Sequence, residues 1–388
     1  MDISKFAKKE LLAMGATSAT RVTMGPMPGL INLGAGDPDF NQPNFINKAV
    51  YDAMKAGHTH YEFSGVPDFK VAIAEYYSKY GVKIDPMTQI AIDSGGSQAI
   101  FRAFGAILNP GDEVMLMDPA YQGYNQPAAY FGAKLTRAPM KKDKKGIFRP
   151  DIDNIRKAVS PRTKAILICN PDNPTGAVYT ERELQKIADV AVEKDLVLIS
   201  DEIYTEFCWG RHKFIPTMKM KGAEERTMAL MSFSKTFAWT GCRAGYVIAG
   251  PDLSKLVQGV PIGITGMPVP FQYAGALALR KGWSFVRKMK KEYKKRLDFM
   301  VKRLNEIPGV TCPYPEGTFY VFPDVSSIGI PSAKFSQDLF MQEKVRAAPG
   351  TNYGSVAEGH VRFALVASLE TLEDAGNRIE RFIKKNKS

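Results

Sequence analysis

A lysine, two serines and an arginine lie close together in one short segment of the chain. The segment reads Ser232-Phe-Ser-Lys235-Thr-Phe-Ala-Trp-Thr-Gly-Cys-Arg243, and its start overlaps the apolar run 228–233, which is typical of a buried strand in a parallel sheet. Ligands of open α/β sheets bind at the carboxyl ends of such strands. A lysine amine placed there, among hydroxyl groups and near an arginine, is suited to bond a carbonyl carbon beside a phosphate. Taken alone, the segment also fits a surface lysine on a turn between a strand and a helix.

Two glycines and a serine follow another predicted strand, residues 89–93. Gly95, Gly96 and Ser97 open a helical pattern directly after it. Backbone N–H groups at a helix N-terminus form an anion site, and glycines leave those groups unshielded by side chains. The motif is therefore suited to bind a phosphate, and the alternative is an ordinary turn between a strand and a helix.

Four polar or aromatic side chains follow three further predicted strands. Asp201 could pair with a protonated pyridine nitrogen, and Tyr204 could donate a hydrogen bond to a phenolic oxygen of the same ring. Asn173, in a loop stiffened by prolines, could bind that oxygen or a substrate carboxylate, and Tyr121 could stack on the ring. In isolation these residues are also explained as a helix cap or as turn residues. Together with Lys235 they predict a site for pyridoxal phosphate, which forms Schiff bases with lysine.

Short apolar runs alternate with helical patterns between about residues 90 and 250. The runs predicted as strands are residues 89–93, 113–117, 134–139, 164–169, 196–200, 227–233 and 244–249. Such alternation predicts an α/β fold, with a large domain whose mostly parallel seven-stranded sheet is covered by helices on both faces. We place this domain at residues 41–280. We assign residues 1–40 and 281–388 to a smaller α+β domain that is built from both ends of the chain.

The charge and the cysteine pattern exclude several function classes. The formal net charge is +12, but much of the excess lies in residues 280–303, where apolar residues recur every three or four positions. This pattern predicts a helix whose lysines form a solvated face. No zinc-finger or RNA-binding signature accompanies it, so we expect no nucleic-acid partner. The four cysteines, Cys169, Cys208, Cys242 and Cys312, have no paired spacing, which argues against disulfides and indicates a reducing compartment.

Metal and membrane signals are also missing from the sequence. The four histidines show no metal-binding spacing, so we expect no metal site. No apolar stretch reaches the length of a membrane span or of a signal-peptide core. The sequence is therefore interpreted as that of a soluble cytoplasmic protein with no membrane partner.

Taken together, these motifs resemble those of fold type I pyridoxal phosphate enzymes. They are specifically similar to those of class I/II aminotransferases in the aspartate aminotransferase superfamily. One motif that carries the resemblance is the lysine segment, with Arg243 eight residues after Lys235. The other is the loop Asn-Pro-Asp-Asn173-Pro-Thr-Gly, which is followed about thirty residues later by Asp201-Glu-Ile-Tyr204. The resemblance covers nearly the whole chain and keeps the family order of motifs.

The resemblance implies a role for each of these residues. Lys235 would be the Schiff-base lysine, and Lys235, Asp201 and Tyr204 would be the catalytic residues. The residues implied to bind the cofactor are Gly95, Gly96, Ser97, Tyr121, Asn173, Asp201, Tyr204, Ser232, Lys235 and Arg243. Arg362 would hold the substrate α-carboxylate through two parallel hydrogen bonds, and Asn173 and Gly36 would complete the substrate site.

The resemblance also implies a homodimer with shared active sites. Tyr61, in the segment Tyr61-Glu-Phe-Ser-Gly65, matches a tyrosine that the family donates to the cofactor phosphate of the partner subunit. The spacing from this tyrosine to the glycine is one residue shorter here than in many members of the family.

The implied activity is transfer of an amino group from an L-amino acid to a 2-oxo acid, with 2-oxoglutarate as the expected acceptor. The reaction would follow a ping-pong mechanism through the Schiff base at Lys235. A carbon–sulfur β-lyase on the same fold is the alternative, and release of pyruvate and ammonia would distinguish it. A pyridoxal phosphate-sensing regulator would need a DNA-binding module, for which the fold leaves no room. Aspartate or aromatic substrates are favoured, while alanine and branched-chain substrates stay open.

Overall fold

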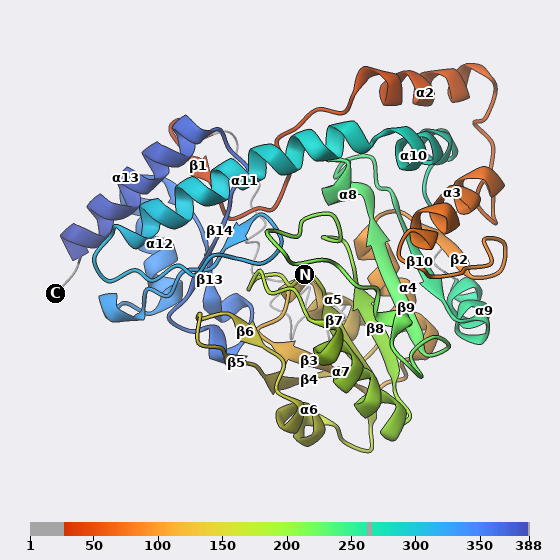
Figure 1. The fold of residues 1–388 in the computed structure, drawn as a ribbon, viewed down its shortest axis with the longest axis horizontal. Coiled ribbons are helices and arrows are strands. Elements are labelled where there is room, and N and C mark those ends of the chain that lie inside the picture. Colours follow the sequence, from red (N-terminus) through yellow and green to blue (C-terminus); the bar gives the residue numbers. More distant parts are fainter. Residues whose placement is uncertain (1–26, 262–265, 387–388) are drawn as a thin grey trace, which may run out of the picture.

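The structure, a computed structural model that describes residues 27–261 and 266–386, is built around a seven-stranded sheet (Figure 1). The strand order is β2-β10-β9-β8-β7-β3-β4. The strands are β2 (Ile90–Asp93), β3 (Glu113–Asp118), β4 (Lys134–Pro139), β7 (Thr163–Cys169), β8 (Val197–Asp201), β9 (Thr227–Ser232) and β10 (Gly245–Ala249). All neighbours are parallel except β10, which runs antiparallel to β2 and β9. The mostly parallel sheet is confirmed, and each predicted strand end lies within one residue of the observed end.

Helices cover both faces of this sheet because its central strands are apolar on both sides. The helices around the sheet are α2 (Asn44–Lys55), α3 (Pro67–Ser78), α4 (Gly96–Ile107), α5 (Asn125–Tyr130), α6 (Ile152–Ala158), α7 (Glu181–Glu193), α8 (Phe233–Thr236), α9 (Pro251–Gly259) and α10 (Val269–Lys281). In β7, Ala165 and Leu167 pack with α4 and α9 on one face of the sheet. Ile166 and Ile168 pack with α6 and α7 on the other face. This burial on both sides is what a parallel sheet requires.

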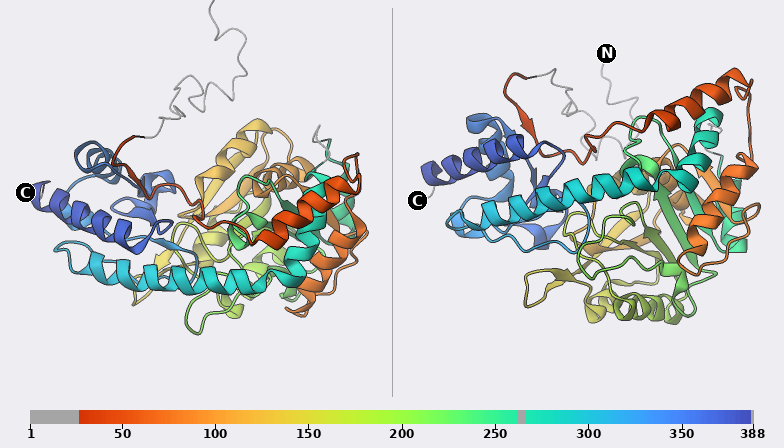
Figure 2. Two further views of the ribbon diagram at one scale, coloured as in Figure 1. Left: turned by 90° about the horizontal axis from the view of Figure 1, so that it is seen from above. Right: turned by 45° about the horizontal axis from the view of Figure 1, so that its top comes forward.

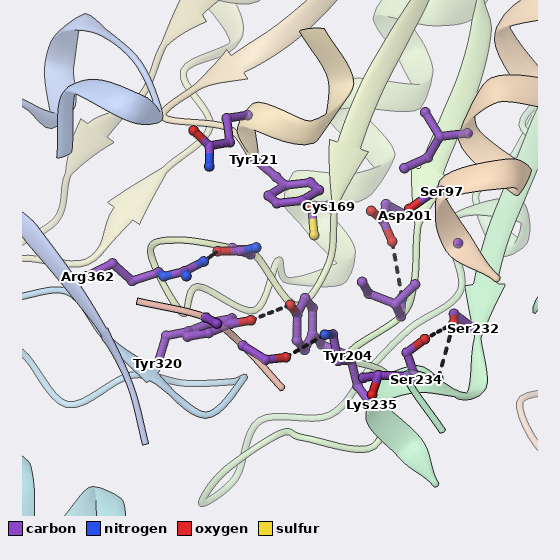
Figure 3. Close-up of a pocket in the computed structure, with 18 of the residues that line it drawn as sticks. Ser97, Tyr121, Cys169, Asp201, Tyr204, Ser232, Ser234, Lys235, Tyr320 and Arg362 are labelled. Carbon is purple, nitrogen blue, oxygen red and sulfur yellow. Dashed lines mark hydrogen bonds between the residues drawn. The ribbon is translucent and has the colours of Figure 1, made fainter. Parts of the chain in front are cut away.

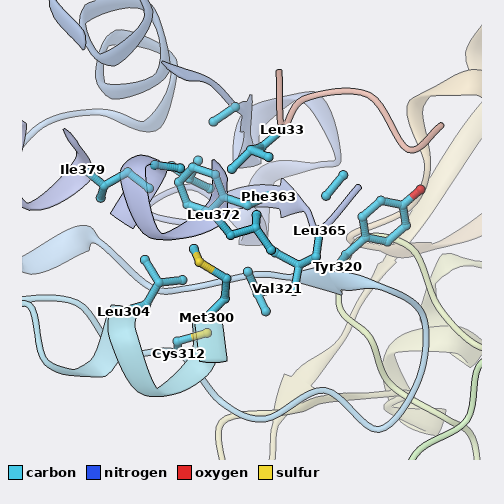
Figure 4. Packing of buried hydrophobic residues seen from close by; sticks show 14 of the residues in the cluster. Leu33, Met300, Leu304, Cys312, Tyr320, Val321, Phe363, Leu365, Leu372 and Ile379 are labelled. Carbon is cyan, nitrogen blue, oxygen red and sulfur yellow. The ribbon is translucent and has the colours of Figure 1, made fainter. Parts of the chain in front are cut away.

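A second group of elements lies beside the sheet and joins the two ends of the described chain. The elements are α11 (Trp283–Asn305), β11 (Tyr320–Val321), α12 (Ser332–Glu343), β12 (Val345–Arg346), β13 (Ala348–Pro349), β14 (Val361–Ala364), α13 (Leu369–Asn386) and the early strand β1 (Ile31–Asn32). β1 pairs in parallel with β12, and Leu33 packs in one core with Phe363 and Leu372 (Figure 4). The predicted basic helix is confirmed as α11, which begins after Gly282.

α11 connects the two groups of elements (Figure 2). Its Val286 packs with the core of α3 and α10, whereas Met300 and Leu304 pack in the core that holds Leu33. The division into domains at residue 281 stays a prediction, and residues 1–26 of the predicted small domain lie outside the described residues. Within the described residues, no helix is both long enough and apolar enough to cross a bilayer.

Short elements fill several connections between the main ones. They are β5 (Lys141–Lys142), β6 (Phe148–Arg149) and the 3-10 turns η2 (Gln122–Tyr124), η3 (Thr217–Lys219), η4 (Ser326–Ile328), η5 (Gly350–Asn352) and η6 (Ser355–Ala357).

The carboxyl ends of β7, β8 and β9 lie side by side at one edge of the sheet. Cys169 ends β7 and is the register partner of Asp201, which ends β8. β9 ends at Ser232, and α8 follows it directly and carries Lys235. α4 begins at the same edge, since a Cβ atom built on Gly96 would lie 3.5 Å from Cβ of Ser232. Residues at these strand ends therefore face one common space.

Candidate active site

A cavity of about 400 Å³ opens at this edge of the sheet (Figure 3). The predicted site residues that line it are Gly36, Gly96, Ser97, Tyr121, Asn173, Asp201, Tyr204, Ser232, Lys235, Arg243 and Arg362. Its other lining residues, which were not predicted, are Gly34, Ala35, Ile100, Gln122, Cys169, Ile203, Ser234, Thr240 and Tyr320. Side chains from segments far apart in the sequence thus meet in one pocket of a size suited to a cofactor and a small substrate.

One end of the cavity is built to hold an anion. α4 starts there without a side chain capping its N-terminus, and Ser97 lies in its first turn. Ser232 Oγ lies 2.8 Å from Ser234 Oγ, and the Arg243 guanidinium donates hydrogen bonds to the backbone carbonyls of Thr240 (2.7 Å) and Ser94 (3.1 Å). Free N–H groups at a helix terminus, hydroxyl groups and a guanidinium are the donors that bind phosphate in proteins.

Gly95 packs against Arg243 at this end of the cavity but does not itself line the cavity. Its backbone has φ = +82°, and a Cβ atom built there would lie 2.6 Å from Nη2 of Arg243. Any other residue would therefore strain the turn and displace the guanidinium. The predicted contact of Gly95 with the cofactor stays a prediction, and what the structure shows is a requirement for glycine beside Arg243.

Lys235 lines the cavity, and its amine is partly desolvated. Nζ donates a hydrogen bond of 2.5 Å to the carbonyl oxygen of Gly36. Burial lowers the pKa of Lys235 to about 8; the Asp37 carboxylate opposes this, and the Arg362 cation adds to it. A lysine with such a pKa has a substantial neutral fraction near pH 8, so its amine can act as a nucleophile or as a base.

Asp201 is the acidic group of the cavity. It is buried, and Oδ2 accepts a hydrogen bond of 2.8 Å from the hydroxyl of Tyr124. Burial raises the pKa of Asp201 to about 6, and a cationic ligand beside it would lower that pKa again by favouring the carboxylate. Tyr124 was missed in the sequence, although it lies only three residues after Tyr121, in the turn η2.

Arg362 is a buried cation whose hydrogen-bond partners among the described residues are all neutral. Nη1 donates to Oδ1 of Asn173 (2.8 Å), and Nη2 donates to the carbonyl oxygen of Gly34 (2.6 Å). Nε is buried and has no partner among the described residues, and none of their acidic side chains pairs with this guanidinium. Since a buried charge is costly unless it is paired, the site is complementary to an anion. Asn173 turns its oxygen toward Arg362, which leaves its Nδ2 group as a donor.

Tyr61, like Gly95, is a predicted site residue that does not line the cavity. It lies in the loop between α2 and α3 with 76% of its surface exposed, and its ring stacks on that of Phe63, which is 80% exposed. Its predicted role concerns a partner subunit and stays a prediction.

The donor set fits pyridoxal phosphate. Of the described residues that line the cavity, Lys235, Arg243 and Arg362 are cations, and the one carboxylate is that of Asp201. Such a balance suits a phosphate at one end, a substrate carboxylate at the other, and a protonated pyridine nitrogen beside Asp201. Among the described residues, no cluster of histidine, cysteine, aspartate and glutamate could hold a metal ion.

Comparisons with known proteins agree with this chemistry. The family model described as aminotransferase class I and II matches residues 28–379. Aromatic-amino-acid aminotransferase 2 of Thermococcus litoralis is 38% identical over 366 residues, which covers 92% of this chain and 93% of that protein. An aspartate aminotransferase of Pyrococcus abyssi is 38% identical over 368 residues, covering 93% of each.

The likeness extends to three-dimensional structure. The crystal structure of an aromatic aminotransferase from Pyrococcus horikoshii superimposes with a TM-score of 0.88 at 36% identity, covering 92% of this chain and 97% of that chain. The fold and the family inferred from the sequence are thereby confirmed. The chain belongs to the class I and II aminotransferase family and is a pyridoxal phosphate-dependent aminotransferase.

Proposed function

We propose that this enzyme moves the amino group of aspartate or an aromatic L-amino acid to 2-oxoglutarate by a ping-pong mechanism. The observation that carries the proposal is the buried Arg362 guanidinium, which has no acidic partner in the described part of the chain and lines the same cavity as the desolvated Lys235 amine. The carboxylate of an amino acid would pair with the guanidinium of Arg362. Its amino group would react beside the amine of Lys235. The choice of donors is supported by the relatives, which are named aromatic-amino-acid and aspartate aminotransferases.

The residues would divide the binding of the cofactor among them. Ser97, Ser232 and Arg243 would hold its phosphate, together with the N-terminus of α4. Tyr121 would cover one face of its ring, and Asp201 would keep the ring nitrogen protonated. Pyridoxal phosphate, when bound, supplies a carbonyl carbon that bonds amines and a ring that withdraws electrons from the substrate α-carbon.

The substrate would be held by its carboxylate and deprotonated by the lysine. Arg362 would bind the carboxylate through its fork of N–H donors, and Nδ2 of Asn173 would add a further hydrogen bond. These hydrogen bonds would fix the direction of the substrate Cα–H bond. Nζ of Lys235 would then take the α-proton and hold it for return, as general base and general acid. Tyr204 would hold the phenolic oxygen of the cofactor.

A panel of amino acids tests the proposed reaction. The purified, cofactor-loaded protein is mixed with one amino acid at a time, without an acceptor, and its absorbance is recorded between 300 and 500 nm. We expect aspartate or aromatic amino acids to shift the cofactor band to shorter wavelength and to release one equivalent of the matching 2-oxo acid. Continuous release of pyruvate and ammonia with an unshifted band would contradict the proposal and indicate a β-lyase. The names of the relatives, which are aminotransferases, do not favour this alternative.

We further propose that the enzyme is a homodimer and that Tyr61 completes the site of the partner subunit. α2 and the loop after it expose several large apolar side chains, namely Tyr51 (63%), Met54 (54%), Tyr61 (76%) and Phe63 (80%). Contiguous exposed apolar groups are typical of an interface. A cytoplasmic location, inferred from the sequence, likewise stays a prediction.

Mixing two inactive variants tests this shared site. Tyr61→Ala and Lys235→Ala are each expected to lose most activity as pure dimers. After they are unfolded and refolded together in equal amounts, half of the dimers carry one of each chain, and one site of each such dimer has both natural residues. Activity should therefore return to about a quarter of the wild-type level. No return of activity in a mixture shown by mass spectrometry to contain the mixed dimer would place Tyr61 outside the partner's site.

A further inference from the structure

Tyr320 joins two of the site residues and was not singled out in the sequence. It begins the short strand β11, lies only 2% exposed, and lines the cavity (Figure 3). Its hydroxyl oxygen lies 2.7 Å from the hydroxyl oxygen of Tyr204. The face of its ring lies against Arg362, whose guanidinium carbon is 4.2 Å from the ring centroid. Tyr320 thus contacts both the residue proposed to hold the cofactor oxygen and the residue proposed to hold the substrate carboxylate.

The hydrogen bond between the two tyrosines restricts where each proton can lie. Each hydroxyl carries a single proton, and either oxygen could be the donor. If Tyr204 donates into the cavity, its oxygen can only accept from Tyr320. If Tyr204 instead donates to Tyr320, it has no proton left for a ligand. The direction of this one hydrogen bond therefore decides whether Tyr204 can serve as a donor in the site.

The surroundings of Tyr320 favour donation toward Tyr204. Among the described residues, the hydroxyl of Tyr320 forms a hydrogen bond only with the hydroxyl of Tyr204. Gly36 packs tightly beside it, since a Cβ atom built on Gly36 would lie 1.9 Å from the Tyr320 hydroxyl. Burial raises the pKa of Tyr320, whereas the Arg362 cation over its ring opposes that rise. Burial also holds the pKa of Tyr204 well above its usual value, so both hydroxyl groups keep their protons at neutral pH.

We propose that Tyr320 is a positioning residue that donates its proton to Tyr204, so that the hydroxyl of Tyr204 donates to the phenolic oxygen of the cofactor. Hydrogen bonds in such a chain strengthen one another. The inference rests on the proposed role of Tyr204. It gives Tyr320 a function that depends on its hydroxyl group and not on its ring.

The test follows the pH dependence of the absorbance of the cofactor-loaded enzyme. A hydrogen bond donated to the ring oxygen favours its anionic form and lowers the pH at which the bound cofactor loses its proton. We expect Tyr204→Phe to raise the midpoint of this titration by about one pH unit or more, as for a hydrogen bond to a charged group. Tyr320→Phe should raise it by about 0.2 to 0.5, the share due to cooperativity. The double variant should match Tyr204→Phe alone, because Tyr320 acts only through Tyr204.

Tyr353→Phe is the matched control. Tyr353 is also buried with its ring against Arg362 (5.3 Å), but its hydroxyl has no hydrogen-bond partner among the described residues. Its substitution should leave the midpoint in place. Phenylalanine at position 320 keeps the ring that packs on Phe319 and Arg362, so the fold should be retained, and a thermal unfolding curve checks this.

The outcomes separate this inference from the proposal on which it rests. An unchanged midpoint in Tyr204→Phe would overturn the role of Tyr204 itself. A raised midpoint in Tyr204→Phe with none in Tyr320→Phe would overturn only the role of Tyr320. If Tyr320→Phe raises the titration midpoint as much in the Tyr204→Phe variant as in the wild-type enzyme, Tyr320 acts by a route other than Tyr204. If Tyr320→Phe changes only the unfolding temperature, the role of Tyr320 is merely structural.

Discussion

Replacing Lys235 by alanine is expected to reduce transamination by at least about 10⁴-fold, at the upper end of what proton transfer by one side chain contributes. The reason is that Nζ lies in the cavity, desolvated and with a pKa of about 8. The other two catalytic residues proposed here cannot replace it, because burial keeps the Tyr204 hydroxyl protonated and Asp201, with a pKa of about 6, is the weaker base. The measurement is single-turnover conversion of the cofactor band with a saturating amino acid. The phosphate-binding groups are untouched, so the variant should still bind pyridoxal phosphate, which equilibrium dialysis can show.

Lys70→Met is the matched control for this substitution. Lys70 is also a buried lysine whose pKa is lowered by burial, but it lies in α3, and its Nζ contacts the backbone carbonyl of Met87 at 3.5 Å. We expect the Lys70→Met variant to keep normal transamination turnover, which would show that loss of a buried lysine does not by itself inactivate the enzyme. Turnover of a few per cent in Lys235→Ala would contradict the assignment of Lys235 as the base.

Replacing Arg362 by leucine is expected to lower kcat/KM for amino acids by about 10²- to 10³-fold, which corresponds to about 3–4 kcal/mol for removing one partner of a buried charge pair. Within residues 27–261 and 266–386, the buried guanidinium has only an amide and a carbonyl as hydrogen-bond partners, so its charge is available to the substrate carboxylate. Arg362→Lys should recover little of the loss, because an ammonium group cannot form the two parallel hydrogen bonds of the guanidinium fork.

The decisive measurement compares an amino acid with the amine that lacks its carboxylate, such as phenylalanine with phenethylamine. The wild-type enzyme should prefer the amino acid strongly, and Arg362→Leu should lose most of that preference while its residual rate with the amine stays similar. An equal loss of rate with both compounds would show that Arg362 maintains the structure of the cavity and does not recognise the carboxylate.

Much of the site was predictable because it is built on consecutive strands of one parallel sheet. Residues that follow β7, β8 and β9 reach the same edge whatever the details of packing, so Asn173, Asp201 and Lys235 could be placed together from their positions after apolar runs. The helix N-terminus with Gly96 and Ser97 was predictable for the same reason. Arg362 was assigned through the family resemblance, and the structure places it in the cavity.

Other features depend on contacts between segments that the sequence does not relate. Tyr124 contacts Asp201 across 77 positions, and Tyr320 contacts Tyr204 across 116. The packing of Gly95 against the guanidinium of Arg243 likewise exists only after the chain has folded back by about 150 residues, and the predicted contact of Gly95 with the cofactor stays a prediction.

The sequence by itself therefore determined the class of fold, the family and the identity of the residues able to do the chemistry. Strand periodicity is a local property, and the carboxyl ends of parallel strands must meet. Only the tertiary structure decided the partners of those residues: the tyrosine beside Asp201, the tyrosine between Tyr204 and Arg362, and the absence of an acidic partner for Arg362 among the described residues. Hydrogen bonds and charge pairing act over a few ångströms, so they are set by how distant segments pack and not by the pattern along the chain.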